Sequence, residues 1–268
     1  MKLQFIVDKT QLISATIKNY NAYQRIPFPA WKRLEKRLWS KYKNDPAYYF
    51  VNPYIKASHT VWALEDLSRQ SALNGIPFKN VLSDALKKVD SIYQEIEESD
   101  EFKRLHKETS NYLLLTKKRW NAKEVEIFQF ITKVAGITLP AKTVKVFINH
   151  PKTGGGQAYS ENNALRWGHS EDWPNYTVVY LAHELMHILT KKQQKTDKTM
   201  HSLIELMTDN ELRIRLNGEG DYLTIDGHAY IKELVQKILP IWQDYLAGKL
   251  KAKNIFELEK YIIKKGIA

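Results

Sequence analysis

The sequence contains no cysteine among its 268 residues. This absence excludes disulfide bonds and every metal site built on thiolates, so a transition metal would have to be held by histidine and carboxylate. No apolar run approaches the roughly 18 residues that a membrane span requires. The apolar stretch at the N-terminus ends at Asp8 and is too short for a secretion signal. We therefore expect a soluble, cytoplasmic protein with no membrane partner.

Internal repeats and low-complexity tracts are also missing, and the hydrophobic fraction of 43% is ordinary for a globular protein. The formal charge is +11, from 41 basic and 30 acidic residues, which leaves nucleic acid open as a partner. The basic residues are spread along the chain, however, and no zinc finger, RNA-binding signature or helix-turn-helix is present. We interpret them as solvated, lysine-rich helix faces.

One short segment carries recognisable chemistry: residues 183–187 read H-E-L-M-H, an H-E-x-x-H motif inside an apolar run. His183 and His187 are four residues apart, so on a helix both imidazoles can reach one ion from the same side. A zinc ion held by two histidines and a third ligand lowers the pKa of its bound water to about 7. Glu184 is then placed to serve as general base.

A third ligand is needed because catalytic zinc keeps three protein ligands and one open position. The segment 200–216 has a helical pattern that ends at Asn217-Gly218. On such a helix His201, Glu205 and Asp209 share one face, whereas Glu211 lies on another part of the surface. The residues alone leave three competing ligands: Glu205, His201 and Glu211.

Glu205 lies 18 residues after His187, and residues 205–209 read E-L-M-T-D, an E-x-x-[ST]-D arrangement. In these motifs, within residues 142–212, the chain resembles the gluzincins, the thermolysin-like and aminopeptidase-like clan of zinc metallopeptidases. The resemblance implies His183, His187 and Glu205 as zinc ligands, Glu184 as base, and Asp209 as the carboxylate that supports a zinc-bound histidine. The chain departs from the clan at Tyr180, where a small or β-branched residue is commoner. It also lacks a G-A-M-E-N-type motif, which puts aminopeptidase activity in doubt.

Two further features complete the expected site. Peptide hydrolysis passes through an oxyanion that needs a second electrophile, for which His228 is the first candidate and Tyr230 and Tyr222 follow. His228 comes directly after a turn predicted at Asp226-Gly227. Strands predicted at 143–149 and 164–167, joined by a loop rich in glycine, would provide an edge for an extended substrate.

The expected fold class is mainly α (α+β). A helical N-terminal region, 1–120, precedes a zincin-like catalytic region, 121–268, with a small β-sheet and C-terminal helices, and the two regions pack as one unit. Helices are expected over 95–118, from Asn121 onward, over 229–247 with a kink or break at Pro240, and over 254–265.

The sequence thus predicts a zinc metallopeptidase with one zinc per chain and a peptide or protein substrate. Two alternatives stay open. A SprT-like, DNA-associated protease would use His201 as ligand, whereas a non-catalytic helical binding protein would use the metal for stability alone. Metzincin spacing is excluded because residue 193 is glutamine.

Overall fold

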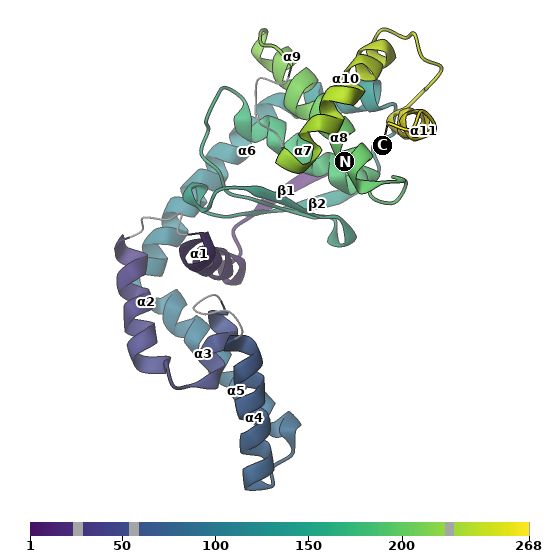
Figure 1. Ribbon diagram of the computed structural model, residues 1–268. Helices are drawn as coiled ribbons and strands as arrows, with labels where there is room; N and C mark the ends of the chain where they lie inside the picture. The colour runs from purple at the N-terminus through teal and green to yellow at the C-terminus, as the bar shows by residue number, and fades with distance from the viewer. Residues whose placement is uncertain (24–28, 54–58, 223–227, 268) are drawn as a thin grey trace. The chain divides into compact units, whose positions relative to one another are not determined.

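The computed structural model describes residues 1–268 except 24–28, 54–58, 223–227 and 268 (Figure 1). The protein is mainly helical and has a small, mixed, four-stranded sheet, as expected for its class. No helix among the described residues combines the length and apolarity needed to cross a membrane. In chain order the α-helices and strands are β1 (Lys2–Ile6), α1 (Lys9–Tyr23), α2 (Pro29–Tyr42), α3 (Pro46–Val51), α4 (His59–Asn74), α5 (Phe78–Glu98), α6 (Asp100–Ala135), β2 (Thr143–Ile148), β3 (Gly156–Tyr159), β4 (Ala164–Trp167), α7 (Tyr176–Thr190), α8 (Asp197–Ile204), α9 (Arg213–Asn217), α10 (Lys232–Leu246) and α11 (Ile255–Lys264).

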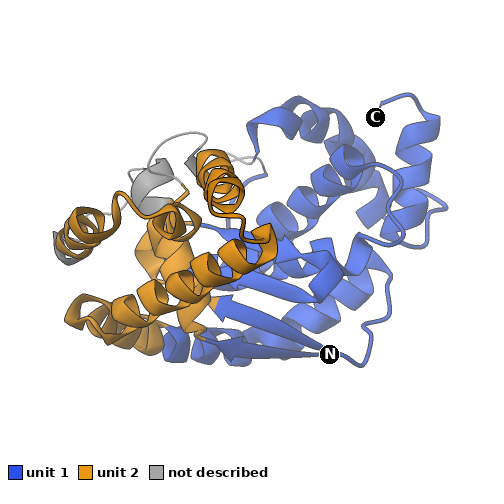
Figure 2. Cartoon of the chain, turned by 90° about the horizontal axis from the view of Figure 1, so that it is seen from below, with its two compact units in different colours: residues 1–6, 113–147, 155–268 blue, residues 7–112, 148–154 orange. Residues whose placement is uncertain are grey.

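The chain divides into two compact units (Figure 2). Unit 1 contains residues 1–6, 113–147 and 155–268, and unit 2 contains residues 7–112 and 148–154. This division differs from the expected regions 1–120 and 121–268, because the first strand belongs to unit 1 and residue 120 lies inside α6.

The helix start predicted at Asn121 is wrong. Helix α6 runs without interruption from Asp100 to Ala135, and this stretch contains neither proline nor glycine to end it. The break instead lies at Ser99, whose Oγ accepts the backbone N–H of Phe102 at 3.2 Å. A serine that accepts this hydrogen bond is a helix N-cap, which separates α5 from α6 inside the predicted helix 95–118.

The sheet of unit 1 has the strand order β1-β2-β4-β3. Strand β1 pairs in parallel with β2, with Lys2 opposite Thr143, whereas β3 pairs antiparallel with β4, with Gly156 opposite Trp167. The strands predicted at 143–149 and 164–167 are confirmed, while β1 was not expected. Strand β3 lies at an edge of the sheet.

Helix α7 packs against β3, β4 and α8, which places the H-E-x-x-H segment between the sheet and the following helices. The helical segment predicted over 200–216 is confirmed in the main, but its centre, Glu205–Leu212, is π-helical and joins α8 to α9. It ends at Gly218, which adopts the left-handed φ of 75° that favours glycine. Helix α10 continues through Pro240 without a break, and α11 confirms the last predicted helix.

Unit 2 has its own apolar core, to which α1, α2, α3, α5 and α6 contribute. Tyr48 and Trp31 are buried there, and Trp39 and Tyr42 pack against the same cluster. These four aromatic residues therefore belong to the core of unit 2 or pack against it, whereas Trp62 is exposed. The remaining buried members are Leu12, Ile13, Ile17, Leu34, Leu38, Ala47, Val51, Ile92, Ile96, Phe102 and Leu105.

Candidate metal centre

Helix α7 positions the motif residues. It is apolar on nearly all sides and almost wholly buried, so its polar side chains must be satisfied by neighbours. Asn175 precedes α7 with a φ of 64°, and its side chain makes no capping hydrogen bond but donates to Asn217 Oδ1 at 2.9 Å. The carboxylate of Glu171 instead accepts the N–H and the hydroxyl of Thr177, in the first turn of the helix.

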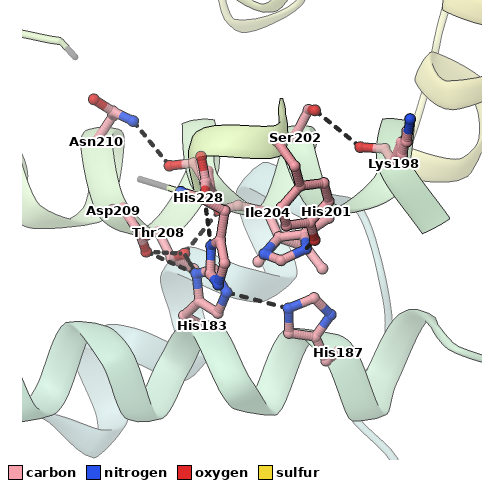
Figure 3. Close-up of polar contacts among 12 residues, drawn as sticks. His183, His187, Lys198, His201, Ser202, Ile204, Thr208, Asp209, Asn210 and His228 are labelled. Carbon is pink, nitrogen blue, oxygen red and sulfur yellow. Dashed lines mark hydrogen bonds and ion pairs between the residues drawn. The ribbon is translucent and has the colours of Figure 1, made fainter. Parts of the chain in front are cut away.

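His183 and His187 converge as their spacing predicts. Their Nε2 atoms lie 3.1 Å apart (Figure 3). The ring of His201, from α8, approaches both, with centroid distances of 5.4 Å to His183 and 4.6 Å to His187. One nitrogen from each of the three histidines lies within 4.8 Å of the others, a spacing that one metal ion could bridge.

The nitrogens of His201 indicate that a metal fits this place. Its Nδ1 lies 2.6 Å from the hydroxyl of Tyr230, whereas its buried Nε2 has no hydrogen-bond partner among the described residues. A buried polar nitrogen without a partner costs about 1–3 kcal/mol. Coordination to a metal would satisfy it, while Tyr230 would hold the ring in the matching orientation.

Glu205 lies in an overlapping group with His201 and His228, and not in the group with His183 and His187. Its Oε1 accepts the backbone N–H of His228 at 2.9 Å and lies 2.8 Å from the Nδ1 of the same residue. The role of Glu205 as third ligand therefore stays a prediction. The side chain of His228 is half exposed and lines the same cavity as Glu184. The turn predicted at Asp226-Gly227 lies outside the described residues.

Asp209 makes the contact that was expected of it. Its Oδ1 lies 2.8 Å from His183 Nδ1 and also accepts the hydroxyl of Thr208 at 2.9 Å, in a buried setting. A carboxylate in this position fixes the histidine tautomer and leaves Nε2 free to face a metal. Glu211, by contrast, forms an ion pair with Arg215 at 2.6 Å and accepts the hydroxyl of Tyr222, so it joins neither group.

The three histidines of this group, His183, His187 and His201, differ in their tendency to carry a positive charge. Burial alone would lower the pKa of His183, but the carboxylate of Asp209 raises it to about 9. Burial, reinforced by the charge on His183, lowers the pKa of His187 to about 2 and that of His201 to about 3. Two of the three imidazoles are therefore neutral at pH 7, which is the form that binds metals.

Glu184 points toward the edge strand β3. Burial raises the pKa of its carboxyl, and a backbone hydrogen bond at Ala158 partly opposes this effect. A β-carbon built on Gly156 would lie 2.6 Å from Glu184 Oε1, so this glycine leaves the room that the carboxylate occupies. The glycine-rich sequence was expected to form a loop, but its third glycine begins β3. In the sequence, the one signal of this close approach was the glycine itself, because a glycine in a strand often marks a place where another group comes near the backbone.

A cavity of about 570 Å³ opens beside the histidines and Glu184. It is lined by strand β3, Glu184, Tyr230 and four histidines: His183, His187, His201 and His228. The ring of Tyr180 lies 6.1 Å from that of His183 and stacks on Trp167 at 6.3 Å.

No family model, curated protein or solved structure matches this chain. The chemistry of the side chains in the cavity is therefore what indicates the function.

Proposed function

We propose that the protein is a zinc-dependent metallopeptidase. One observation carries the proposal: the Nε2 atoms of His183 and His187 lie 3.1 Å apart in a cavity that the carboxylate of the intervening Glu184 also lines. A structural metal site has no use for that carboxylate, whereas hydrolysis requires a base beside the metal.

His183 and His187 would hold the ion, and the third ligand would come from His201 or Glu205. A bound zinc ion would polarise a peptide carbonyl and lower the pKa of a coordinated water to about 7. Glu184, buried and adjacent, would accept a proton from the attacking water and return it to the leaving amine. His228 and Tyr230 line the same cavity and are the candidates to stabilise the oxyanion.

An extended peptide is the substrate that this cavity would accept most readily. Strand β3 lines the cavity and is an edge strand, so backbone groups on its open side could pair with a peptide, apart from the one of Ala158 that is bonded to Glu184. Such pairing would lay the peptide beside Glu184, because Gly156 and Ala158 of this strand adjoin that carboxylate.

The deciding experiment measures zinc content by elemental mass spectrometry and hydrolysis of a peptide library by the same preparations. Wild type is expected to hold near one zinc per chain and to cleave peptides. Glu184→Gln should keep zinc and lose hydrolysis, and a fully active Gln variant would sink the mechanism. Zinc loss in His201→Ala or in Glu205→Ala identifies the third ligand, with Glu211→Gln as the matched control.

A second candidate function follows from the three-histidine group, because His201 as ligand is the arrangement expected of a SprT-like, DNA-associated protease. It predicts salt-sensitive retention on DNA. No retention at low salt would exclude it. A protein that holds zinc, unfolds when the zinc is removed and cleaves no peptide would instead be a metal-stabilised binding protein.

A further inference from the structure

A second cavity, of about 520 Å³, opens in unit 1 beside the cavity of the candidate metal centre. The two cavities share three lining residues, Ser160, Glu161 and Lys191. Ser160 follows β3 directly, and its hydroxyl donates to the backbone carbonyl of His187 at 3.3 Å. A peptide extended along β3 would therefore reach the second cavity at the end of the strand.

Three lysines line this second cavity, which we call the lysine pocket: Lys142, Lys191 and Lys192. One acidic residue, Glu161, faces them among the lining residues. Apolar side chains, Ile188 and Phe256 among them, make up other parts of the wall. The pocket thus combines a positive charge with an apolar surface, which suits a carboxylate carried on a peptide.

The lysines are only partly neutralised by the protein itself. Lys191 lies 3.5 Å from Asp197, and Lys142 donates a hydrogen bond to Asn163. Lys192 has no ion pair or hydrogen bond within the described part of the chain. Burial, and the nearby charge of Lys192, lower the pKa of Lys142. Like charges held together at a partly buried site repel each other, and an anion between them would relieve that repulsion.

We propose that the lysine pocket binds a carboxylate of the peptide substrate, so that peptides with an acidic residue or a free C-terminus away from the scissile bond are preferred. This inference rests on the proposed peptidase function for the identity of the ligand. The pocket itself is independent of the metal, because no histidine of the candidate metal centre lines it.

The test uses the full-length, zinc-loaded Glu184→Gln variant and fluorescence anisotropy with labelled peptides. The peptides share one neutral core and carry, on either side, glutamate or glutamine, with the C-terminus amidated or free. Glutamate or a free C-terminus is expected to tighten binding by about tenfold or more, as a hydrogen-bonded charge typically does. Comparison of the amidated and free forms identifies which carboxylate is bound.

Lysine variants then locate the binding. The double variant Lys142→Gln and Lys192→Gln should abolish the preference for the peptide carboxylate. Lys192→Gln alone, an exposed change that spares folding, should weaken this preference. The control pair, Lys198→Gln and Lys260→Gln, removes the same charge from exposed residues that line neither cavity. Two results would overturn the proposal: equal affinity for all the peptides, whether glutamate or glutamine and amidated or free, or equal losses in the two lysine pairs.

Hydrolysis of neutral peptides by wild type keeps the two proposals separable. Hydrolysis without any charge preference in binding would leave the peptidase standing and remove the lysine pocket. Lysine-dependent binding of acidic peptides without hydrolysis of any peptide would establish the pocket while the peptidase function falls.

Discussion

Gly156 and Glu184 are in such close contact that a β-carbon on residue 156 would lie 2.6 Å from Glu184 Oε1. Non-bonded carbon and oxygen atoms do not approach so closely, so either the carboxylate or the strand would have to move. The glycine is thus part of what positions the candidate base.

Gly156→Ala should displace the Glu184 carboxylate and reduce hydrolysis by about 100-fold, the cost typical of a 1 Å misplacement of a catalytic group. Zinc content should stay at the wild-type level, because the methyl group is directed at Glu184 and not at the histidines. Steady-state kinetics and elemental analysis on one preparation check both points. Unchanged kcat/KM would mean that Glu184 is not held by this contact.

Asp209→Asn should weaken zinc affinity by about 10- to 100-fold, the loss usual when the hydrogen-bonding partner of a metal-bound histidine is changed. The physical reason is that the amide no longer offers a full negative charge to His183 Nδ1, 2.8 Å away. Competition with a chromogenic chelator measures the affinity. Glu211→Gln, on the same helical segment but paired with Arg215, is the control and should match wild type.

Glu259→Ala should lower the free energy of unfolding by about 1–3 kcal/mol, because it removes the acceptor of two part-buried backbone hydrogen bonds. Glu259 lies on α11, is fully buried, and its Oε1 accepts the backbone N–H groups of Lys195 and Thr196 at 2.8 Å each. Glu259→Gln keeps an oxygen acceptor and should cost less. Chemical denaturation measures all three proteins, and Lys260→Ala, an exposed neighbour, should change nothing.

Acidification should destabilise the protein in part through His150. This side chain is buried, with Nε2 3.2 Å from Glu108 Oε2, and burial lowers its pKa more than Glu108 raises it. The unfolded chain takes up the proton near the ordinary pKa of about 6.5, while the folded chain resists it, so stability is lost as pH falls below that value.

His150→Gln should therefore make the decrease in unfolding free energy between pH 7.5 and 5.5 shallower than in wild type. Denaturant titrations at both pH values give the slope. His106→Gln, a histidine change on the neighbouring α6, should leave the slope as it is. An identical slope in His150→Gln would show that this histidine carries no linkage.

The sequence predicted best what local periodicity determines. The convergence of His183 and His187 follows from residues four apart in a helix. Asp209 makes its expected contact with His183, although it lies in the π-helical stretch. Strand β2 was predicted from its alternating, β-branched pattern, and β4 was expected as a second short strand at 164–167. The predicted activity, the zinc ion and the third ligand stay predictions, because no contact in the structure tests them.

What the sequence did not predict depends on contacts between distant residues. The role of Gly156 becomes visible once β3 is placed against α7, and the grouping of His201 with His183 and His187 requires the crossing of α7 and α8. The π-helical stretch Glu205–Leu212 changes the hydrogen-bond ladder within one helix, which a period count over residue types does not register.

The parallel pairing of β1 with β2 has a consequence for the order in which the protein can assemble. Lys2 is synthesised before residues 7–112, but its partner, Thr143, is synthesised only after all of them. Unit 2 thus interrupts the sequence of unit 1 twice, with residues 7–112 and with residues 148–154. Strand β1 can therefore pair with β2 only after residues 7–112 of unit 2 have been synthesised. The sheet that supports Glu184 can be completed only then.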